Sequence, residues 1–462
     1  MAPTLERVCF KNFWDKYSAR PDNSAMMLNK NADDIEAADR ADILGSLPDI
    51  KDKDAVDIGA GIGRFTTVLA ETARHVLSTD FIDSFVKKNM ERNAHLGNID
   101  YAVGDAVNLK LSDNSVDMVF TNWLMMYMSD REVVEFLTNA IRWLRPNGWM
   151  HLRESCSEPS TGRKAPVTMH DAAAANPTSY RFSSLYINII RSVRLRDAEG
   201  RLWRFELHWS CSVPTYIKRM SNWRQVHWLM QKVPADSTET VPTFDELLQN
   251  FETTWNEEQK AWDAKLDGES FVWTDSIFDK SLPTGRFDRN SALFVYTPRR
   301  LSPFLHINSH RLAEKYGANV WNVELEPFFY RTSLTKANTV KDQRVRFSWH
   351  PSLGSSVEYW TQRHAKFDAL LATELLSTTE SDAELASAIS LLNSGSPLCL
   401  LEPIRDIDEA GITRRLTAAG VSDVVVEEIT EEAQREIAHY FKEHNMEPES
   451  YSMKWVKISG RV

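Results

Sequence analysis

The sequence has few cysteines and no pattern that would pair them. Its four cysteines in 462 residues lie far apart, and none forms a CxxC pair: Cys9, Cys156, Cys211 and Cys399. This spacing disfavours a zinc site or a disulfide framework, and it favours a reducing compartment, so we expect a cytoplasmic protein. No run of about 18 apolar residues is long enough to span a bilayer. The first 15 residues also lack the apolar core of a signal peptide.

An excess of positive charge is also missing. The chain has 54 Lys and Arg against 65 Asp and Glu, a formal net charge of −11. This balance disfavours a nucleic-acid-binding protein, because phosphate contacts need clustered basic residues. The chain is nevertheless rich in core-forming residues, with 15 Trp and 21 Phe, which argues against disorder. Its length predicts two to four domains.

Short apolar segments alternate with helical patterns in the first half. We predict strands at 54–58, 75–80, 99–103, 116–120 and 149–153. Helices are expected at 64–73, after the second strand as far as residue 93, and at 130–144. This alternation predicts a parallel sheet covered on both faces, with ligands beyond the carboxyl ends of its strands. Two antiparallel strands are expected at 203–211 and 226–231. The polar segment 155–185 before them reads as a substrate cap.

A second α/β pattern begins near Leu293. Its expected strands are 304–307, 320–323, 345–348, 367–371, 397–401, 424–429 and 453–458. The order echoes the first half and suggests a divergent internal copy. Asn308, Ser309 and His310 follow the first of these strands in place of a glycine turn, so a nucleotide-like ligand could not approach that backbone closely. We therefore predict three parts: 1–233 with the ligand site and cap, a linker or bridging helical region at 234–292, and a second domain at 293–462.

The sharpest motif is DIGAGIGR at residues 57–64. Glycines allow backbone to approach a ligand closely, and the start of the next helix presents free N–H groups. A dinucleotide fold needs a third glycine at the sixth position from Gly59. That position is Arg64, which disfavours a nicotinamide oxidoreductase. The spacing Gly-x-Gly-x-Gly is instead typical of an S-adenosylmethionine loop.

Acidic residues accompany the first three predicted strands. Asp80 is placed to accept both ribose hydroxyls, and Asp105 to pair with the adenine amino group. With Asp57, they suit a cofactor that carries a sulfonium and an amino group better than one that carries a pyrophosphate. We predict a class I, Rossmann-like α/β domain that binds S-adenosyl-L-methionine and releases S-adenosyl-L-homocysteine. The predicted cofactor-binding residues are Asp57, Gly59, Gly61, Arg64, Asp80, Phe81, Asp105, Ala106 and Asn122.

Several motifs together resemble those of the phosphoethanolamine N-methyltransferases. They are DIGAGIGRFT at 57–66, DFIDS at 80–84, NWLMMY at 122–127, RESC at 153–156, NPTSYR at 176–181 and YIK at 216–218. The similarity covers about residues 10–233. Because the catalytic motifs lie in the first half, the chain is similar to the type-1 enzymes of nematodes. The resemblance implies methylation of phosphoethanolamine to phospho-monomethylethanolamine, the first step toward phosphocholine and phosphatidylcholine, and a degenerate methyltransferase-like domain at 293–462.

A substrate with a phosphate at one end requires Arg, Lys, Tyr or Ser donors. Tyr180 and Lys218 lie inside matched motifs, and the other candidates lie in or near the polar cap. The predicted substrate-binding residues are Trp123, Ser155, Ser160, Thr161, Arg163, Tyr180, Arg181, Tyr186 and Lys218. For any one of the cap residues, a solvated surface position is the alternative.

Methyl transfer to an amine needs its lone pair, so the site must remove a proton or select the neutral amine. A relative in the resembled family uses a Tyr–His pair there, and Tyr127 stands at the position that matches its His. We predict Tyr17 and Tyr127 as the catalytic residues, with core packing as the alternative for Tyr127. Trp123 stands where that relative has Asp, which suggests amine recognition by an aromatic face. The sequence shows no metal cluster, and the chemistry needs none.

Two other hypotheses remain at this point. One is a methyltransferase that acts on another small phosphorylated or amine acceptor. The other is a non-catalytic binding protein, which the intact glycine loop disfavours for the first half only. The expected partner is the small molecule phosphoethanolamine, with no nucleic acid and no membrane span.

Overall fold

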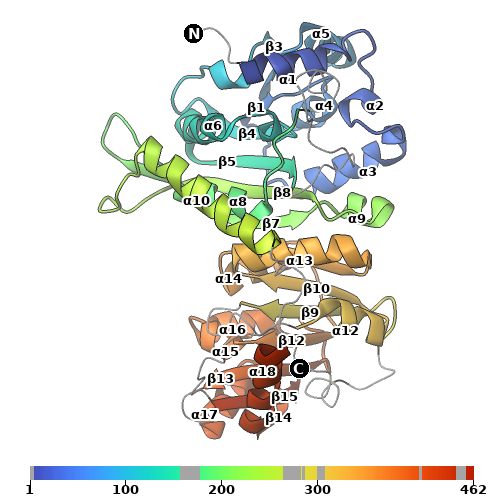
Figure 1. Ribbon diagram of the computed structural model, residues 1–462, viewed down its shortest axis with the longest axis vertical. Coiled ribbons are helices and arrows are strands. Elements are labelled where there is room, and N and C mark those ends of the chain that lie inside the picture. Colours follow the sequence, from blue (N-terminus) through green and yellow to red (C-terminus); the bar gives the residue numbers. More distant parts are fainter. Residues whose placement is uncertain are drawn as a thin grey trace. The chain divides into compact units, whose positions relative to one another are not determined.

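The computed structural model describes residues 5–156, 177–263, 282, 287–298, 307–404, 408–443 and 454–462. The chain divides into two compact units, Met1–Gln259 and Lys260–Val462 (Figure 1). Each unit is described by itself. Within the described residues, no helix is both long enough and apolar enough to cross a membrane.

Unit 1 contains a sheet in the order β7-β8-β5-β4-β1-β2-β3. Its parallel strands are β1 (Asp54–Ile58), β2 (His75–Asp80), β3 (Ile99–Val103), β4 (Val116–Asn122) and β5 (Leu144–Ser155). Two antiparallel strands, β7 (Leu202–Ser212) and β8 (Gln225–Pro234), continue it from β5, and β6 (Arg194–Arg196) pairs with β7. The predicted α/β class and the alternating order of strands and helices are confirmed.

The helices of unit 1 connect or flank these strands. Three precede the sheet: α1 (Leu5–Asp15), α2 (Asn23–Met26) and α3 (Ala32–Leu44). The crossovers are α4 (Arg64–Ala70), α5 (Asp83–Arg92) and α6 (Asp130–Trp143), and α8 (Ser183–Ser192), α9 (Pro214–Met220) and α10 (Phe244–Asp263) follow. A capping box formed by Ser129 and Glu132 fixes the start of α6.

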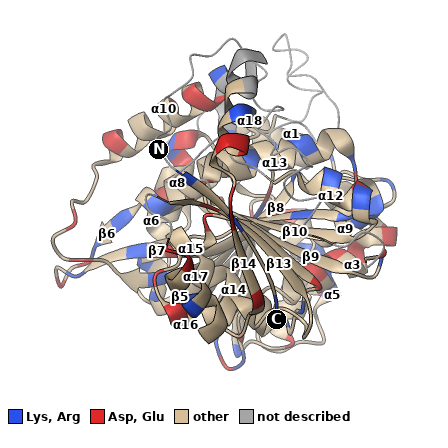
Figure 2. Cartoon of the chain, turned by 90° about the horizontal axis from the view of Figure 1, so that it is seen from below, with Lys and Arg blue, Asp and Glu red and all other residues tan. Residues whose placement is uncertain are grey.

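The core of unit 1 forms where apolar strand residues meet α3 and α4. Ala55, Val76, Met118 and Phe120 pack there with Phe65 and Leu69 of α4, all buried. Figure 2 shows the same segregation of polarity, because the strands are drawn mainly as uncharged residues while Lys, Arg, Asp and Glu lie mostly on helices and turns. This packing holds the carboxyl ends of β1, β2 and β4 in fixed positions.

Unit 2 contains a sheet with the same arrangement, β14-β15-β13-β12-β9-β10-β11. Its strands are β9 (Ala292–Thr297), β10 (Asn319–Glu324), β11 (Val345–Trp349), β12 (Ala369–Thr373), β13 (Pro397–Ile404), β14 (Ser422–Glu428) and β15 (Lys454–Arg461). Between them lie α12 (Ser309–Tyr316), α13 (Pro327–Val340), α14 (Leu353–Gln362), α15 (Leu375–Thr378), α16 (Asp382–Ile389), α17 (Glu409–Ala418) and α18 (Thr430–Glu443). The central strand β9 pairs in parallel with β10 and β12, as β1 pairs with β2 and β4.

Three predicted segments differ from the observed elements or lie partly outside the described residues. The first strand of unit 2 is β9, at Ala292–Thr297, whereas we expected it at 304–307, and 304–306 lie outside the described residues. The stretch 234–292, expected as a linker or bridging helical region, contains the long helix α10. Of the expected cap, 157–176 lie outside the described residues, and its end enters α8.

Candidate functional site: two cavities that share a wall

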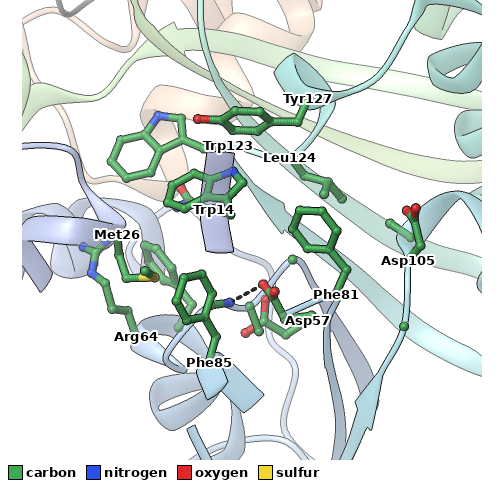
Figure 3. A pocket seen from close by; sticks show the side chains of 18 of the residues that line it. Trp14, Met26, Asp57, Arg64, Phe81, Phe85, Asp105, Trp123, Leu124 and Tyr127 are labelled. Atoms are coloured by element: carbon green, nitrogen blue, oxygen red, sulfur yellow. Dashed lines mark hydrogen bonds between the residues drawn. The ribbon is translucent and has the colours of Figure 1, made fainter. Parts of the chain in front are cut away.

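A cavity lies at the carboxyl ends of β1, β2 and β4 in unit 1, and we call it the strand-end cavity (Figure 3). All nine residues predicted to bind the cofactor line it: Asp57, Gly59, Gly61, Arg64, Asp80, Phe81, Asp105, Ala106 and Asn122. The edge of a parallel sheet is where such folds bind ligands. The structure therefore brings together residues that are 65 positions apart in the chain, from Asp57 to Asn122.

The glycine loop after β1 adopts a backbone that suits only glycine. Gly59, Gly61 and Gly63 have φ angles of 73°, 56° and 79°. A Cβ on Gly59 would lie 2.9 Å from Leu124 Cδ1, and one on Gly61 would lie 2.9 Å from Met26 Sδ. The three glycines therefore have left-handed backbone conformations, and side chains of the cavity wall closely approach two of them. Backbone atoms of the loop are left to face a ligand.

Two carboxylates organise this loop from the strand ends. Asp80 accepts hydrogen bonds from the N–H groups of Gly61 and Ile82, both at 2.9 Å. Asp57 accepts from the Thr66 hydroxyl at 2.6 Å. Burial raises the pKa of Asp57 to about 7, and burial raises the pKa of Asp80 to about 6 although backbone N–H groups oppose it. A cationic or hydrogen-bonding ligand in the cavity would stabilise the ionised form of both.

Asp105 has a neighbour that the sequence did not predict. Arg7 of α1 donates to both of its carboxylate oxygens, with Nε at 3.0 Å from Oδ2, and also to the carbonyl of Tyr127 at 2.7 Å. The Arg7 guanidinium lies 5.9 Å from the centre of the Phe81 ring. An adenine amino group at Asp105 would share this carboxylate with Arg7.

A second cavity, which we call the adjoining cavity, borders the first within unit 1. Its lining includes Tyr17, Trp123, Tyr127, Ser155 and Tyr180, five of the residues predicted for catalysis or substrate binding. Lys30, Tyr216, Met220, Asn222 and Gln225 line it too. Its described wall is thus mainly aromatic and methionine side chains, with a few amides and hydroxyls and one lysine.

Four residues line both cavities: Trp14, Met26, Trp123 and Tyr127. Trp14 and Tyr127 meet edge to face, with ring centres 5.4 Å apart. Figure 3 shows the Tyr127 hydroxyl directed toward Trp123, with Trp14 close to both rings. Among the described residues, these four form the junction at which a group held in one cavity can meet a group held in the other.

The turn that carries these aromatic residues is held by a buried carboxylate. Glu154 of β5 accepts from the N–H groups of Leu124, Met125 and Met126, at 3.0, 2.7 and 3.2 Å. Burial raises the pKa of Glu154 to about 7. Trp123, just before this turn, has a φ of 58°, a strained conformation for a tryptophan.

Several predicted substrate residues lie away from the adjoining cavity. Arg181 is buried and binds Asp130 at 2.6 Å and the carbonyls of Met125 and Met128, so it supports the turn from behind. Tyr186 is fully buried beside Trp228, and Lys218 is exposed in the last turn of α9. Ser160, Thr161 and Arg163 lie outside the described residues.

Sequence reasoning missed Arg7, Trp14 and Met26 in the strand-end cavity and Lys30, Asn222 and Gln225 in the adjoining one. Arg7 and Trp14 come from α1, which contains no recognised motif, whereas Met26 lies in the segment 26–28, which also resembles the family but was assigned no role. The clustered aromatics of the N-terminal segment, Phe10, Phe13, Trp14 and Tyr17, were the available signal, since such a run on a short polar helix needs a partner surface.

Comparisons with known proteins agree with this geometry. A family described as "Methyltransferase domain" matches residues 56–152. Phosphoethanolamine N-methyltransferase 1 of Caenorhabditis elegans is 58% identical over 440 residues, which are 95% of this chain and 92% of that protein. A wheat (Triticum aestivum) phosphoethanolamine N-methyltransferase 1 is 38% identical over 232 residues, 50% of this chain and 45% of that protein.

Solved structures give the same result. Phosphoethanolamine N-methyltransferase 1 of Haemonchus contortus, in complex with phosphoethanolamine and S-adenosylhomocysteine, matches with a TM-score of 0.94 and 55% identity over 100% of this chain and 99% of that one. The second such enzyme of Haemonchus contortus matches with a TM-score of 0.58 at 15% identity, over 92% and 99% of the two chains, which shows a shared fold.

Proposed function

This chain belongs to the phosphoethanolamine N-methyltransferase family, and from that premise we propose that it transfers a methyl group from S-adenosylmethionine to phosphoethanolamine. The product would be phospho-monomethylethanolamine. The observation that carries the proposal is the shared wall of the two cavities, because the donor and the acceptor must meet there. Holding them together supplies a large part of the rate enhancement, since it removes the entropy cost of their encounter.

The donor would occupy the strand-end cavity. Its residues fit S-adenosylmethionine: the glycine loop has the backbone freedom for close approach, and Asp80 ends β2 at the place of a ribose. Asp57 beside the loop suits the cofactor's cationic end. When bound, the cofactor supplies an electrophilic methyl group on a sulfonium.

The acceptor would occupy the adjoining cavity, with its amine at the aromatic junction. Ser155, Tyr180 and Lys30 would serve the phosphate, since they supply hydroxyl and ammonium donors. Tyr17 and Tyr127 would orient the amine. The predicted roles of Ser160, Thr161 and Arg163 concern residues outside the described ones and remain predictions.

The second unit would be a degenerate copy of the first. The strand pairings align β9, β10 and β11 with β1, β2 and β3, which puts Val295 at the position of Asp57, Glu324 at that of Asp80 and Pro351 at that of Asp105. Thr297 stands where Gly59 begins the loop. Because two of the three carboxylates and the first glycine are replaced, we infer catalysis in unit 1 alone, and we propose a cytoplasmic location.

A radiolabelled methyl-transfer assay tests this function. S-adenosylmethionine would be offered with phosphoethanolamine, with its mono- and dimethyl forms, and with free ethanolamine. We expect label to enter phosphoethanolamine alone, because the phosphate anchors the acceptor and the reaction stops after one methylation. Label in none of the four acceptors, with the cofactor still bound, would overturn the proposed substrate.

A further inference from the structure

A buried arginine lies directly against the tryptophan of the junction. The Arg153 guanidinium stacks on the Trp123 ring, with its carbon 3.6 Å from the ring centre. Arg153 is fully buried. The indole N–H of Trp123 donates to Gln225 at 2.8 Å, which fixes the ring. One aromatic face of Trp123 is therefore in contact with the Arg153 guanidinium, so a ligand in the cavity can contact only the opposite face of the ring.

The charges behind Trp123 do not cancel. Asp39 of α3 lies 3.5 Å from Arg153 but only 2.9 Å from Arg64, so one carboxylate serves two guanidinium groups. Its neighbour on α3, Glu36, pairs with Arg40, Arg64 and Arg92 at 3.0, 3.5 and 3.8 Å. This network of described residues holds four arginines (Arg40, Arg64, Arg92 and Arg153) and two carboxylates (Asp39 and Glu36), an excess of two positive charges.

The described lining residues of the adjoining cavity carry no negative charge that would balance this excess. Among its described lining residues there is no carboxylate and no histidine. Its ionisable groups are Lys30, from the segment after α2, and four tyrosines, Tyr17, Tyr127, Tyr180 and Tyr216. Burial raises the pKa of Tyr216, so that tyrosine stays neutral. Asn122, which accepts from Arg153 at 2.8 Å, is neutral as well.

The nearest carboxylates act elsewhere. Asp57 and Asp80 are directed to the glycine loop side of the strand-end cavity, and Asp105 is bound by Arg7. Glu154, next to Arg153 on β5, points to the other face of the sheet, where three backbone N–H groups hold it. Asp42 of α3 accepts from the N–H of Thr215. On the side of the adjoining cavity, an ammonium group at the junction would meet aromatic rings with Arg153 behind Trp123, and no carboxylate of the described lining residues.

We propose that Arg153 is a positioning residue that disfavours the ammonium form of the bound acceptor, so that the amine loses its proton to water before methyl transfer. The inference rests on the proposed function and deepens it. A like charge behind the aromatic face opposes a second cation in front of it, because it cancels the attraction of the ring for positive charge. The site then needs no histidine to generate the nucleophile.

The step balances without a further reactant. The acceptor R–NH3⁺ gives its proton to water and keeps the nitrogen lone pair. That lone pair forms the new N–C bond to the methyl group, and the C–S bond breaks with its electron pair going to sulfur, which becomes the neutral thioether. The product is a secondary ammonium ion, which the same positive field disfavours and thus helps to release.

The test measures how many protons are released when phosphoethanolamine binds. The full-length protein, saturated with S-adenosylhomocysteine, is titrated calorimetrically with phosphoethanolamine at pH 7.5, in buffers that differ in ionisation enthalpy. The phosphate, with a pKa of about 6, is then already mostly a dianion, while the free amine, like that of lysine near 10, is protonated. We expect the wild type to release close to one proton on binding. Arg153→Gln should release half of that or less, and Arg153→Lys, which keeps the charge, should resemble the wild type.

A kinetic readout separates this role from a structural one. The pH profile of kcat reports groups in the enzyme–substrate complex. In Arg153→Gln, its acidic limb should move up by about 1 pH unit, because the bound amine now holds its proton more tightly. Binding with no proton release by the wild type, or an identical release by Arg153→Gln, would overturn the inference while leaving the proposed function standing. Failure of the wild type to bind phosphoethanolamine would overturn both.

Discussion

At the residue scale, the site depends on a few positions whose backbone only glycine tolerates. Gly61 combines a φ of 56° with a neighbouring sulfur that a Cβ would meet at 2.9 Å. Gly200 has a φ of 82°, and a Cβ there would meet nothing within 4 Å. The two glycines therefore share the backbone cost of substitution but differ in what surrounds them.

Gly61→Ala should weaken S-adenosylmethionine binding by at least about tenfold, because the loop must shift away from Met26 at the cavity wall. Gly200→Ala is the matched control. It should lower the melting temperature of the protein about as much as Gly61→Ala does, but leave the dissociation constant for S-adenosylmethionine unchanged. Calorimetric titration of both variants checks this. Equal affinities for the cofactor would contradict the role given to the loop.

The residues of the site were predictable to different extents. Asp57, Gly59, Gly61 and Asp80 were predictable because strand ends and glycine turns carry their own local signal. Arg7 and Lys30 were not, because each reaches its cavity from a segment whose placement depends on tertiary packing. The contacts of Arg181 were not predictable for a related reason, because its motif does not show that its guanidinium donates to the carbonyls of Met125 and Met128.

At the element scale, two short turns are held in the same way in the two units. Glu154 accepts from the turn at Met125–Tyr127 in unit 1, and Glu402 accepts from the N–H groups of Leu376 and Ser377 in α15 of unit 2. The residues before them, Trp123 and Glu374, both have a left-handed backbone, with φ of 58° and 55°. The aligned positions support an internal duplication.

Glu154→Gln should lower kcat by at least about tenfold, because an amide cannot accept from all three N–H groups and the turn that carries Tyr127 loses its support. Glu402→Gln makes the same chemical change in unit 2 and should leave kcat within about twofold of the wild type. Steady-state assays of both variants check this. A comparable loss of kcat in Glu402→Gln would show that unit 2 takes part in turnover.

Glu402 also makes the stability of the folded protein depend on pH. Burial raises the pKa of Glu402 from 4.5 to about 7, so its favourable contribution is complete below about pH 4.5 and is lost as the pH rises through about 7. The melting temperature of the ligand-free protein should fall between pH 5 and pH 7.5, with Asp57, Asp80 and Glu154 acting in the same direction. The decline should be smaller in Glu402→Gln, which calorimetry at three pH values would measure. An equal decline would contradict the assignment.

Most elements could be predicted where local pattern determines them. The bounds of β1, β2 and β3 match the sequence prediction, since each strand is a short apolar run limited by polar or glycine residues. The prediction did not include β9 at Ala292–Thr297, which has no glycine turn after it to mark it as β1 is marked, and the strand expected at 304–307 lies almost wholly outside the described residues. Helix α10 lies in the stretch 234–292, where a linker or bridging helical region was expected, but its bounds were not predicted because the acidic, tryptophan-rich sequence has weak periodicity.

At the scale of the whole molecule, one fold occurs twice, and the residues proposed to bind the cofactor lie in unit 1. Both sheets have the same strand order, yet unit 1 alone keeps the glycine loop and all three acidic positions. The retained acidic residue of unit 2, Glu324, is fully buried and accepts from the Ser333 hydroxyl at 3.1 Å. Its carboxylate is therefore buried inside unit 2 and used in a hydrogen bond there.

The chain should bind one S-adenosylmethionine. Asp80→Asn should weaken that binding by about tenfold or more, because Asp80 holds Gly61 and faces the ribose position. Glu324→Gln, at the equivalent place in unit 2, should leave both affinity and stoichiometry unchanged. Titration calorimetry measures both quantities, and a second site that disappears in Glu324→Gln would refute the degenerate assignment.

The proposed reaction is tested most directly by the mass of the product formed from phosphoethanolamine and excess S-adenosylmethionine. We expect wild-type protein to add a single methyl group, and Asp80→Asn to add it more slowly at the same cofactor concentration. Glu324→Gln should behave as the wild type does. An unchanged mass of phosphoethanolamine, under conditions in which the cofactor is shown to be bound, would refute the proposed reaction.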